Sequence, residues 1–152
     1  MTDKPIIIVK CEAPDFAKLA QLRHKLWPQE TVEEHLSEIT DLTTNHDYHA
    51  WLTFDEADKT QPIAFMELSL RPYVNGCLYR PVAFLEGIYC HPEYQQQGIG
   101  GQLVEIAEDW ARNKDIQELA SDAYLENEQS HKAHARWGFS QTEKVVYFRK
   151  KL

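Results

Sequence analysis

Apolar positions along the chain alternate between the two-residue period of strands and the three-to-four-residue period of helices. Six runs rich in β-branched and aromatic residues predict strands at 6–9, 48–54, 63–70, 81–90, 118–121 and 145–150. Helical spacing predicts four helices, which cover 14–27, a segment starting at 31, a segment starting at 98, and 127–137. Strands and helices thus alternate along most of the chain, which predicts a mixed sheet with helices on both faces.

Start and stop signals support these helices. Pro28 ends the first, and Thr31 with Glu34 forms a capping box at the start of the second. Gly98 opens the third helix and Gly138 ends the fourth. No repeat, linker or low-complexity stretch divides the sequence, so residues 1–152 are predicted to form one domain.

Charge narrows the classes of partner. The formal net charge of the 152 residues is −8, and the first 60 residues hold 12 acids against 6 bases. Nucleic acid is therefore not expected as a partner, because phosphate binding needs a basic face. An acidic cleft favours a cationic small molecule, whose local concentration it raises. No apolar run approaches the 18 residues of a membrane span, so no membrane partner is expected.

The three cysteines, Cys11, Cys77 and Cys90, are far apart and form no CxxC pair. Neither a disulfide framework nor a metal site is predicted from them. Such sparse use fits a reducing compartment, and a cytoplasmic location is expected. Cys90 is interpreted as a packing residue, because no His/Asp framework for a covalent relay accompanies it.

The segment that most indicates chemistry is the loop QQQGIG at 95–100, between a buried strand and a helix. Its glycines let the backbone approach a ligand closely. The free N–H groups and the dipole at the start of the helix form an anion site suited to a diphosphate. The motifs GxGxxG and GxxxxGK[ST] are both absent. Taken alone, a two-glycine turn before a helix is more often only a tight connection.

Other segments accompany this loop: LEGIYCHP at 85–92 upstream, and Glu126-Asn127, His134 and Gly138-Phe139 downstream. In this order and spacing they resemble the GCN5-related N-acetyltransferase (GNAT) family over about residues 81–140. The resemblance implies an α/β (α+β) fold, with a mixed, mostly antiparallel sheet of six to seven strands and about four flanking helices. It also implies that strands four and five splay apart, with a bulge near 88–90, and that acetyl-CoA is the cosubstrate and no metal is needed.

The same resemblance implies a set of residues that bind the cosubstrate. Strand four lends backbone groups of Ile88, Tyr89 and Cys90 to the pantetheine arm. Asn127 provides a polar contact from the last helix. The pyrophosphate lies in the loop and first helical turn, whose residues are Gln95, Gln96, Gln97, Gly98, Ile99, Gly100 and Gly101.

His134 stands four residues before Gly138, where many members of the family have a tyrosine that protonates the leaving CoA thiolate. A histidine is chemically able to donate this proton. It also serves widely as a packing or surface residue, so His134 is a catalytic candidate with both interpretations open.

Further strings extend the resemblance over nearly the whole chain: LWP at 26–28, YVNGC at 73–77, FLEGI at 84–88, ASD at 120–122 and YFRK at 147–150. They are similar to the aminoglycoside 6′-N-acetyltransferases. This implies transfer of the acetyl group to the 6′-amine of an aminoglycoside, by direct attack in a ternary complex, and hence antibiotic resistance.

Glu86 lies inside an apolar run, where an unpaired carboxylate is costly, so a functional role is favoured. By resemblance, Glu86 and Asp122 bind ammonium groups in the acceptor cleft and remove a proton, directly or through water. Tyr73 lines that cleft and Trp27 stacks on a sugar ring. Each has a structural alternative: a cap or turn for Asp122, and packing for the two aromatic residues.

Two other functions fit the same motifs: an acetyltransferase for another small amine or a peptide, and an acyl-CoA-binding module without turnover. The acidic residues argue against the second, since a CoA-binding module needs no acidic acceptor cleft. A homodimer is expected, in which the strand at 145–150 pairs across a two-fold axis.

Overall fold

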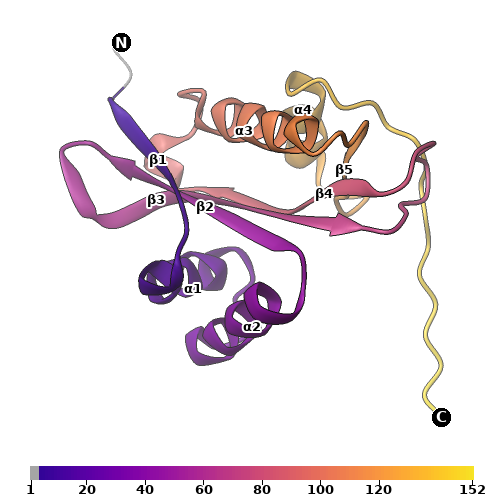
Figure 1. Ribbon diagram of the computed structural model, residues 1–152, viewed down its shortest axis with the longest axis horizontal. Helices are drawn as coiled ribbons and strands as arrows, with labels where there is room; N and C mark the ends of the chain where they lie inside the picture. Colours follow the sequence, from indigo (N-terminus) through magenta and orange to yellow (C-terminus); the bar gives the residue numbers. More distant parts are fainter. Residues whose placement is uncertain (1–3) are drawn as a thin grey trace.

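A computed structural model describes residues 4–152, so the first three residues of the predicted domain lie outside it. Helices flank both faces of one five-stranded sheet (Figure 1). The strands are β1 (Ile6–Lys10), β2 (Tyr48–Asp55), β3 (Asp58–Arg71), β4 (Val82–Cys90) and β5 (Leu119–Ser121). The helices are α1 (Phe16–Leu26), α2 (Val32–Asn45), α3 (Ile99–Asn113) and α4 (Glu128–Arg136), with 3-10 turns η1 (Ala13–Asp15) and η2 (Pro92–Tyr94).

The strands lie in the order β1-β2-β3-β4-β5. The first four are antiparallel and β5 is parallel to β4, which confirms the mixed, mostly antiparallel sheet. The predicted six to seven strands are wrong: five are present among residues 4–152. The strand expected at 145–150 is extended chain instead, because no strand of the described chain lies beside it.

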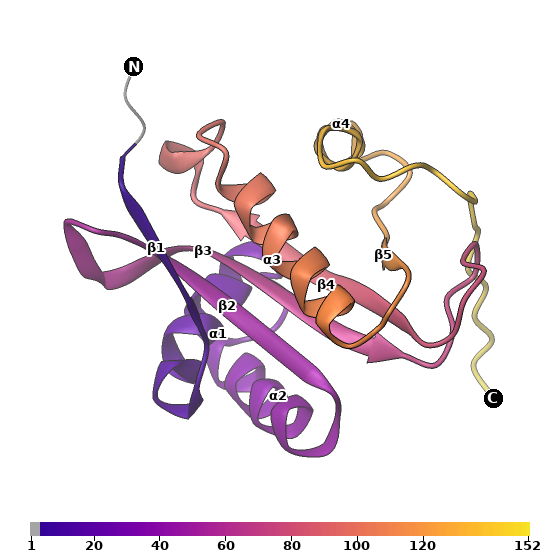
Figure 2. The ribbon, with the colours of Figure 1, turned by 45° about the horizontal axis from the view of Figure 1, so that its top comes forward.

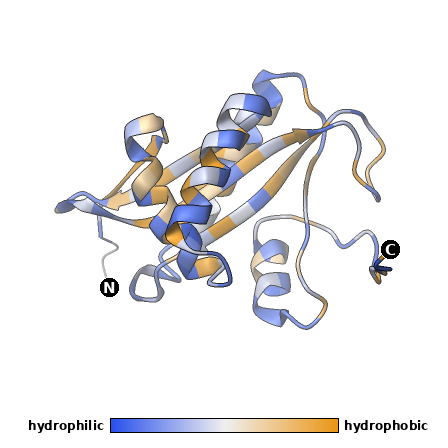
Figure 3. Cartoon of the chain, turned by 90° about the horizontal axis from the view of Figure 1, so that it is seen from below, coloured by the Kyte–Doolittle hydropathy of each residue, from blue (hydrophilic) through white to orange (hydrophobic). Residues whose placement is uncertain are grey.

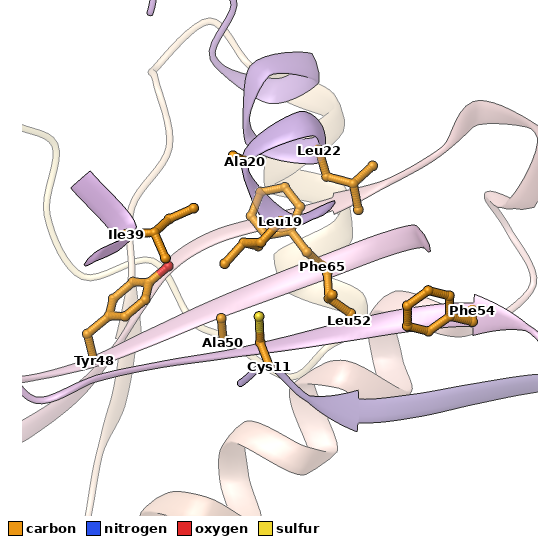
Figure 4. Packing of buried hydrophobic residues seen from close by; sticks show 10 residues of the cluster. All are labelled: Cys11, Leu19, Ala20, Leu22, Ile39, Tyr48, Ala50, Leu52, Phe54 and Phe65. Carbon is orange, nitrogen blue, oxygen red and sulfur yellow. The ribbon is translucent and has the colours of Figure 1, made fainter. Parts of the chain in front are cut away.

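Both faces of the sheet are covered, because successive side chains of β2 point to opposite faces and are apolar on both. Ala50, Leu52 and Phe54 face α1 and α2, while Trp51 packs on the opposite side with the core under α3. In Figure 4 the side chains of α1 meet those of β2 and β3 in this first core. Apolar colour is concentrated on the strands and polar colour on the outer turns of the helices (Figure 3).

Local signals start the helices at the predicted residues. The Thr31 hydroxyl accepts from the N–H of Glu34, and the Glu34 carboxylate accepts from the N–H of Thr31, which confirms the capping box of α2. Gly98 has φ of 81°, a left-handed conformation that a side chain would oppose, and α3 begins directly after it. None of the helices in residues 4–152 is both long and apolar enough to cross a membrane.

The sheet opens between β4 and β5. Only Ala83, Phe84 and Leu85 pair with β5, whose last residue is Ser121, and the chain then turns away towards α4 (Figure 2). A bulge accompanies this opening, since Glu67 pairs with Gly87 but Leu68 pairs with Leu85. The expected splay is therefore present, but the bulge lies at Glu86 and not near 88–90.

After α4 the chain is extended and exposed; it first passes the loop between β3 and β4, where Thr142 lies against Gly76, and then leaves the body (Figure 1). This C-terminal tail, residues 140–152, carries apolar side chains that are 54 to 92% exposed: Val145, Val146, Tyr147 and Phe148. Large apolar side chains in such a run usually have a partner surface.

Candidate active site

A broad, open cleft of about 2350 Å³ includes the place where β4 and β5 part, and α1, α2, α4 and the tail also contribute to its lining. Most of the predicted site residues line it: Trp27, Glu86, Ile88, Tyr89, Cys90, Gln95, Gln96, Gly98, Ile99, Gly100, Gly101, Asp122, Asn127 and His134. Tyr73 and Gln97 are not among the lining residues. The structure thus brings together segments that are up to 107 positions apart in sequence, from α1 to α4.

The loop before α3 has the backbone that an anion site needs. Gln96 has φ of 62° and Gly98 has φ of 81°, so left-handed residues alternate with ordinary ones. Such alternation turns successive N–H groups into a common concavity. The first intrahelical bond is donated by Gln102 to the carbonyl of Gly98, so the earlier N–H groups are left for a ligand. These residues fit the diphosphate of acetyl-CoA.

The loop side chains support this backbone. The Gln95 amide donates to the carbonyl of Cys90 at 3.0 Å, and the Gln97 amide donates to the carbonyl of Glu93 at 3.3 Å. Both bonds tie the loop to the end of β4 and to η2. Gln97 therefore supports the loop, and it is not among the residues that line the cleft.

The part of β4 beyond the split offers an unpaired backbone edge. Ile88, Tyr89 and Cys90 line the cleft, and β5 ends before it reaches them. Strand-like pairing with a ligand amide is the interaction that such an edge supports. Burial raises the pKa of the Cys90 thiol to about 11, so the thiol stays protonated near neutral pH and is a poor nucleophile.

Asn127 is the N-cap residue of α4. Its side-chain oxygen accepts from the N–H of Ser130 at 3.1 Å, which caps the helix. The amide nitrogen of Asn127 has no hydrogen bond among residues 4–152, and the residue lines the cleft. Capping and ligand contact are thus compatible for this residue.

Glu86, the bulge residue, is held by Arg71. The guanidinium donates to both carboxylate oxygens, at 3.0 and 2.8 Å, and the Ser69 hydroxyl also donates to Oε1. Oε2 accepts only one of these bonds, so it keeps an acceptor position for a ligand. The Arg71 guanidinium in turn lies 3.5 Å from the centre of the Phe84 ring.

Asp122 and Tyr73 differ in their relation to Glu86. Asp122 follows β5 directly, is exposed, and makes no hydrogen bond or ion pair within residues 4–152. It lines the same cleft as Glu86. Tyr73 is 60% exposed, with the Arg80 guanidinium over its ring at 5.4 Å, and the structure does not bring it to the cleft.

Trp27 forms a wall of the cleft beside the bulge. A Cβ atom on Gly87 would lie 2.5 Å from Cη2 of its indole, so the ring occupies the space that a side chain at 87 would fill. Behind the ring, Phe65 lies at 6.2 Å and His35 at 6.4 Å between ring centres. Trp27 therefore has little room to retreat.

A buried polar network supports Trp27, and the sequence interpretation missed it. The Arg23 guanidinium donates to Glu67 at 2.6 Å and to Glu38 at 2.5 Å, and its Nε donates to Nδ1 of His35 at 3.1 Å. His35 is thereby left to donate from Nε2 to the carbonyl of Trp27, at 2.9 Å. Burial raises the pKa of the Glu67 carboxyl, and the Arg23 guanidinium opposes that rise.

His134 faces the end of β5. Its Nε2 lies 2.8 Å from the Ser121 hydroxyl, and its Nδ1 lies 2.7 Å from the backbone carbonyl of Ser130. The rings of Trp137 and Phe139 lie at 5.3 and 5.1 Å between centres. Ser121 is a second residue that the sequence interpretation did not single out.

Comparison with known proteins finds a matching family model and several proteins of similar sequence. The model of the acetyltransferase (GNAT) family matches residues 16–139. An aminoglycoside N(6′)-acetyltransferase type 1 from Serratia marcescens is 38% identical, over 96% of this chain and 99% of that protein.

Two solved structures are also similar over almost their full length. One is an aminoglycoside antibiotic 6′-N-acetyltransferase from Acinetobacter baumannii, with a TM-score of 0.89 and 40% identity, covering 97% of this chain and 99% of the other. The other is AAC(6′)-Iy in complex with the bisubstrate analogue CoA-S-monomethyl-acetylneamine. Its TM-score is 0.86 and its identity 33%, over 97% of this chain and 99% of the other.

Proposed function

The chain belongs to the acetyltransferase (GNAT) family, and we propose that it acetylates the 6′-amine of aminoglycoside antibiotics with acetyl-CoA. The observation that carries the proposal is the shape and charge of the cleft. An amide-lined anion site lies at one end, at Gly98 and the start of α3, and Asp and Glu outnumber Lys and Arg by nine to five among the lining residues. The anion site thus suits a diphosphate, and the excess of acidic residues suits a polycation.

Acidic residues from several elements face the acceptor part of the cleft. Glu86 and Asp122 stand on either side of the opening between β4 and β5. Glu30 and Glu38, before and within α2, line it as well. Several carboxylates in one cleft match the several ammonium groups of an aminoglycoside. The sequence and structural similarity to aminoglycoside 6′-N-acetyltransferases supports the same substrate class.

Each carboxylate takes a distinct part in the proposed reaction. Glu86 is fixed by Arg71 and positions the amine through the open acceptor site on Oε2. Asp122, which has no other partner within residues 4–152, accepts the proton of the amine, directly or through water. Acetyl-CoA supplies the activated acyl group, and the splayed backbone of β4 holds it in place for direct attack.

Thiol release from acetyl-CoA, measured across a panel of aminoglycosides, tests this function. We expect turnover of kanamycin and tobramycin. The matched variant Glu86→Gln keeps the size of the side chain but removes its charge, and we expect kcat/KM to fall at least tenfold, which corresponds to about 1.4 kcal/mol. Absence of aminoglycoside turnover, with efficient acetylation of a polyamine or a peptide, would refute the substrate class.

The proposal includes a homodimer built on the tail. Val145, Val146, Tyr147 and Phe148 expose more apolar surface than a soluble monomer usually tolerates in one segment. A second copy covers these side chains when the two tails, or a tail and the edge strand β5, pair across a two-fold axis.

Sedimentation equilibrium tests the dimer. The wild-type chain should have twice the monomer mass. The double variant Val146→Asp/Phe148→Asp places charges in the apolar run and should sediment as a monomer, whereas Lys151→Glu at the polar end of the tail should remain dimeric. A wild-type monomer at micromolar concentration contradicts this assembly.

A further inference from the structure

The ring of His134 has partners at both nitrogens: Nδ1 lies 2.7 Å from the Ser130 carbonyl oxygen and 3.2 Å from the Ser130 hydroxyl, and Nε2 lies beside the Ser121 hydroxyl. The carbonyl oxygen, the nearer partner of Nδ1, can only accept, so Nδ1 carries a hydrogen. Trp137 and Phe139 lie against the ring and oppose its rotation. Nε2 is therefore the nitrogen that can exchange a proton with the Ser121 hydroxyl, at 2.8 Å.

Ser121 occupies the point at which the sheet opens. It is the last residue of β5 and pairs with Leu85, and the next residue of β4 is the bulge residue Glu86. Ser121 and His134 both line the cleft. The hydroxyl and the imidazole thus lie in contact on the wall of the cleft in which the proposed acyl transfer takes place.

We propose that Ser121 is a catalytic residue that passes a proton from His134 to the sulfur of the departing thiol. The inference rests on the proposed function. His134 acts behind Ser121 as a positioning residue and proton store. Many members of the family have a tyrosine at the position of His134. The imidazole ring of His134 and the hydroxyl of Ser121 together span a distance comparable to that of a tyrosine side chain with its terminal hydroxyl.

Each proton that moves in this step passes from a named donor to a named acceptor. Ser121 donates its hydroxyl proton to the sulfur as the carbon–sulfur bond breaks and its electron pair goes to the sulfur. Nε2 of protonated His134 gives its proton to the Ser121 oxygen in the same step, so no alkoxide accumulates. His134 becomes neutral, Nδ1 keeps its bond to Ser130, and solvent returns the proton.

Single-turnover kinetics of acetyl transfer test this role. Because general acid catalysis typically contributes 10²–10⁴-fold, Ser121→Ala should slow transfer by about 100-fold while KM for both substrates changes little. Ser121→Thr keeps a hydroxyl in a residue suited to strands and should recover most of the rate. Ser37→Ala, on the exposed side of α2, serves as the control for loss of a hydroxyl elsewhere.

The double variant Ser121→Ala/His134→Ala distinguishes a relay from two separate effects. A relay predicts that the double variant is no slower than the slower single variant, because either change breaks the same path. Three results overturn the proposal: a wild-type rate for Ser121→Ala, additive losses in the double variant, or a rate loss that follows a fall in thermal stability and is not recovered by threonine.

Failure of the proposed function looks different. In that case the wild-type chain itself releases no thiol with any aminoglycoside. The same variants are then compared on the amine that the wild-type chain does acetylate, and the same three results decide the role of Ser121.

Discussion

Replacing Arg23 by methionine is expected to lower the free energy of unfolding by about 3–5 kcal/mol, because it leaves a buried carboxylate without its counter-charge. Arg23 is 4% exposed and Glu67 is 1% exposed, and their side chains meet at 2.6 Å. Methionine fills much of the arginine volume, so the loss reports mainly the charge and its hydrogen bonds. Urea denaturation followed by circular dichroism measures the effect.

Arg112→Met is the matched control. Arg112 lies on α3, its side chain is 67% exposed, and it pairs with Glu108 and Asp109 on the surface. Exposed pairs of this kind contribute about 0–1 kcal/mol. Equal destabilisation by the two substitutions would show that Arg23 and Glu67 are not coupled as a buried pair.

The sign of the pH dependence gives a second readout for Arg23→Met. Burial raises the pKa of Glu67 and Arg23 opposes this, so removing Arg23 lets the pKa of the folded state rise further above that of the unfolded chain. The folded variant then binds a proton at a pH where the unfolded chain does not. Its stability deficit should therefore shrink as the pH falls through that folded-state pKa.

The second large effect is expected at Gly87, where alanine should reduce kcat/KM for an aminoglycoside about 30-fold. A Cβ atom there would lie 2.5 and 3.0 Å from two atoms of the Trp27 indole, and Phe65 and His35 stand behind the ring. Overpacking of this kind costs about 1–3 kcal/mol, and 30-fold corresponds to about 2 kcal/mol. The ring relieves the contact by moving into the acceptor side of the cleft.

A compensating substitution makes this prediction specific. The two indole atoms in question belong to the outer six-membered ring, so Trp27→Phe removes the collision. Gly87→Ala/Trp27→Phe should melt near the temperature of Trp27→Phe alone, whereas Gly87→Ala in the wild-type background should melt lower and raise KM for the aminoglycoside. Wild-type kinetics for Gly87→Ala would show that Trp27 is free to move without consequence.

The sequence was sufficient for the four helices and for the mixed, mostly antiparallel sheet, but not for the number of strands. Most of the residues that it singled out for the site line the cleft. Alternation in 48–54 and helical spacing before Pro28 depend on local patterns, and local patterns determine which side of an element is buried. Glu86 was singled out because a carboxylate inside an apolar run needs a partner. That partner, Arg71, was not predictable, because β3 and β4 place it beside Glu86 only through the register of the sheet.

The same reasoning applied to Glu67 would have indicated the buried network, since Glu67 also interrupts an apolar strand at 63–70. The partner of Glu67, Arg23, was not predicted, because Arg23 falls on the apolar side of the first predicted helix and its long side chain was taken as part of that side. Ser121 belongs to the ASD string at 120–122, but a serine at a strand end is ordinary and does not by itself indicate a role. Only the packing of α4 against the end of β5 puts its hydroxyl on His134.

In the C-terminal segment the sequence analysis predicted a strand that the structure does not contain. Its residues have strand propensity, and the prediction of a strand at 145–150 depended on propensity alone. A strand also needs a neighbour, and none is present beside residues 140–152 of the described chain. Strand propensity indicates that a segment favours an extended conformation, but it does not indicate which strand the segment pairs with.

The composition of the tail also bears on aggregation. Directly after the apolar run come Arg149, Lys150 and Lys151, three consecutive cations. If free tails stacked in parallel register, as in amyloid fibrils, every chain would place these cations about 4.8 Å from those of its neighbour. An antiparallel pair separates them to opposite ends. The basic cluster therefore disfavours open-ended parallel stacking of the tails, whereas the proposed two-fold pairing keeps the cations apart.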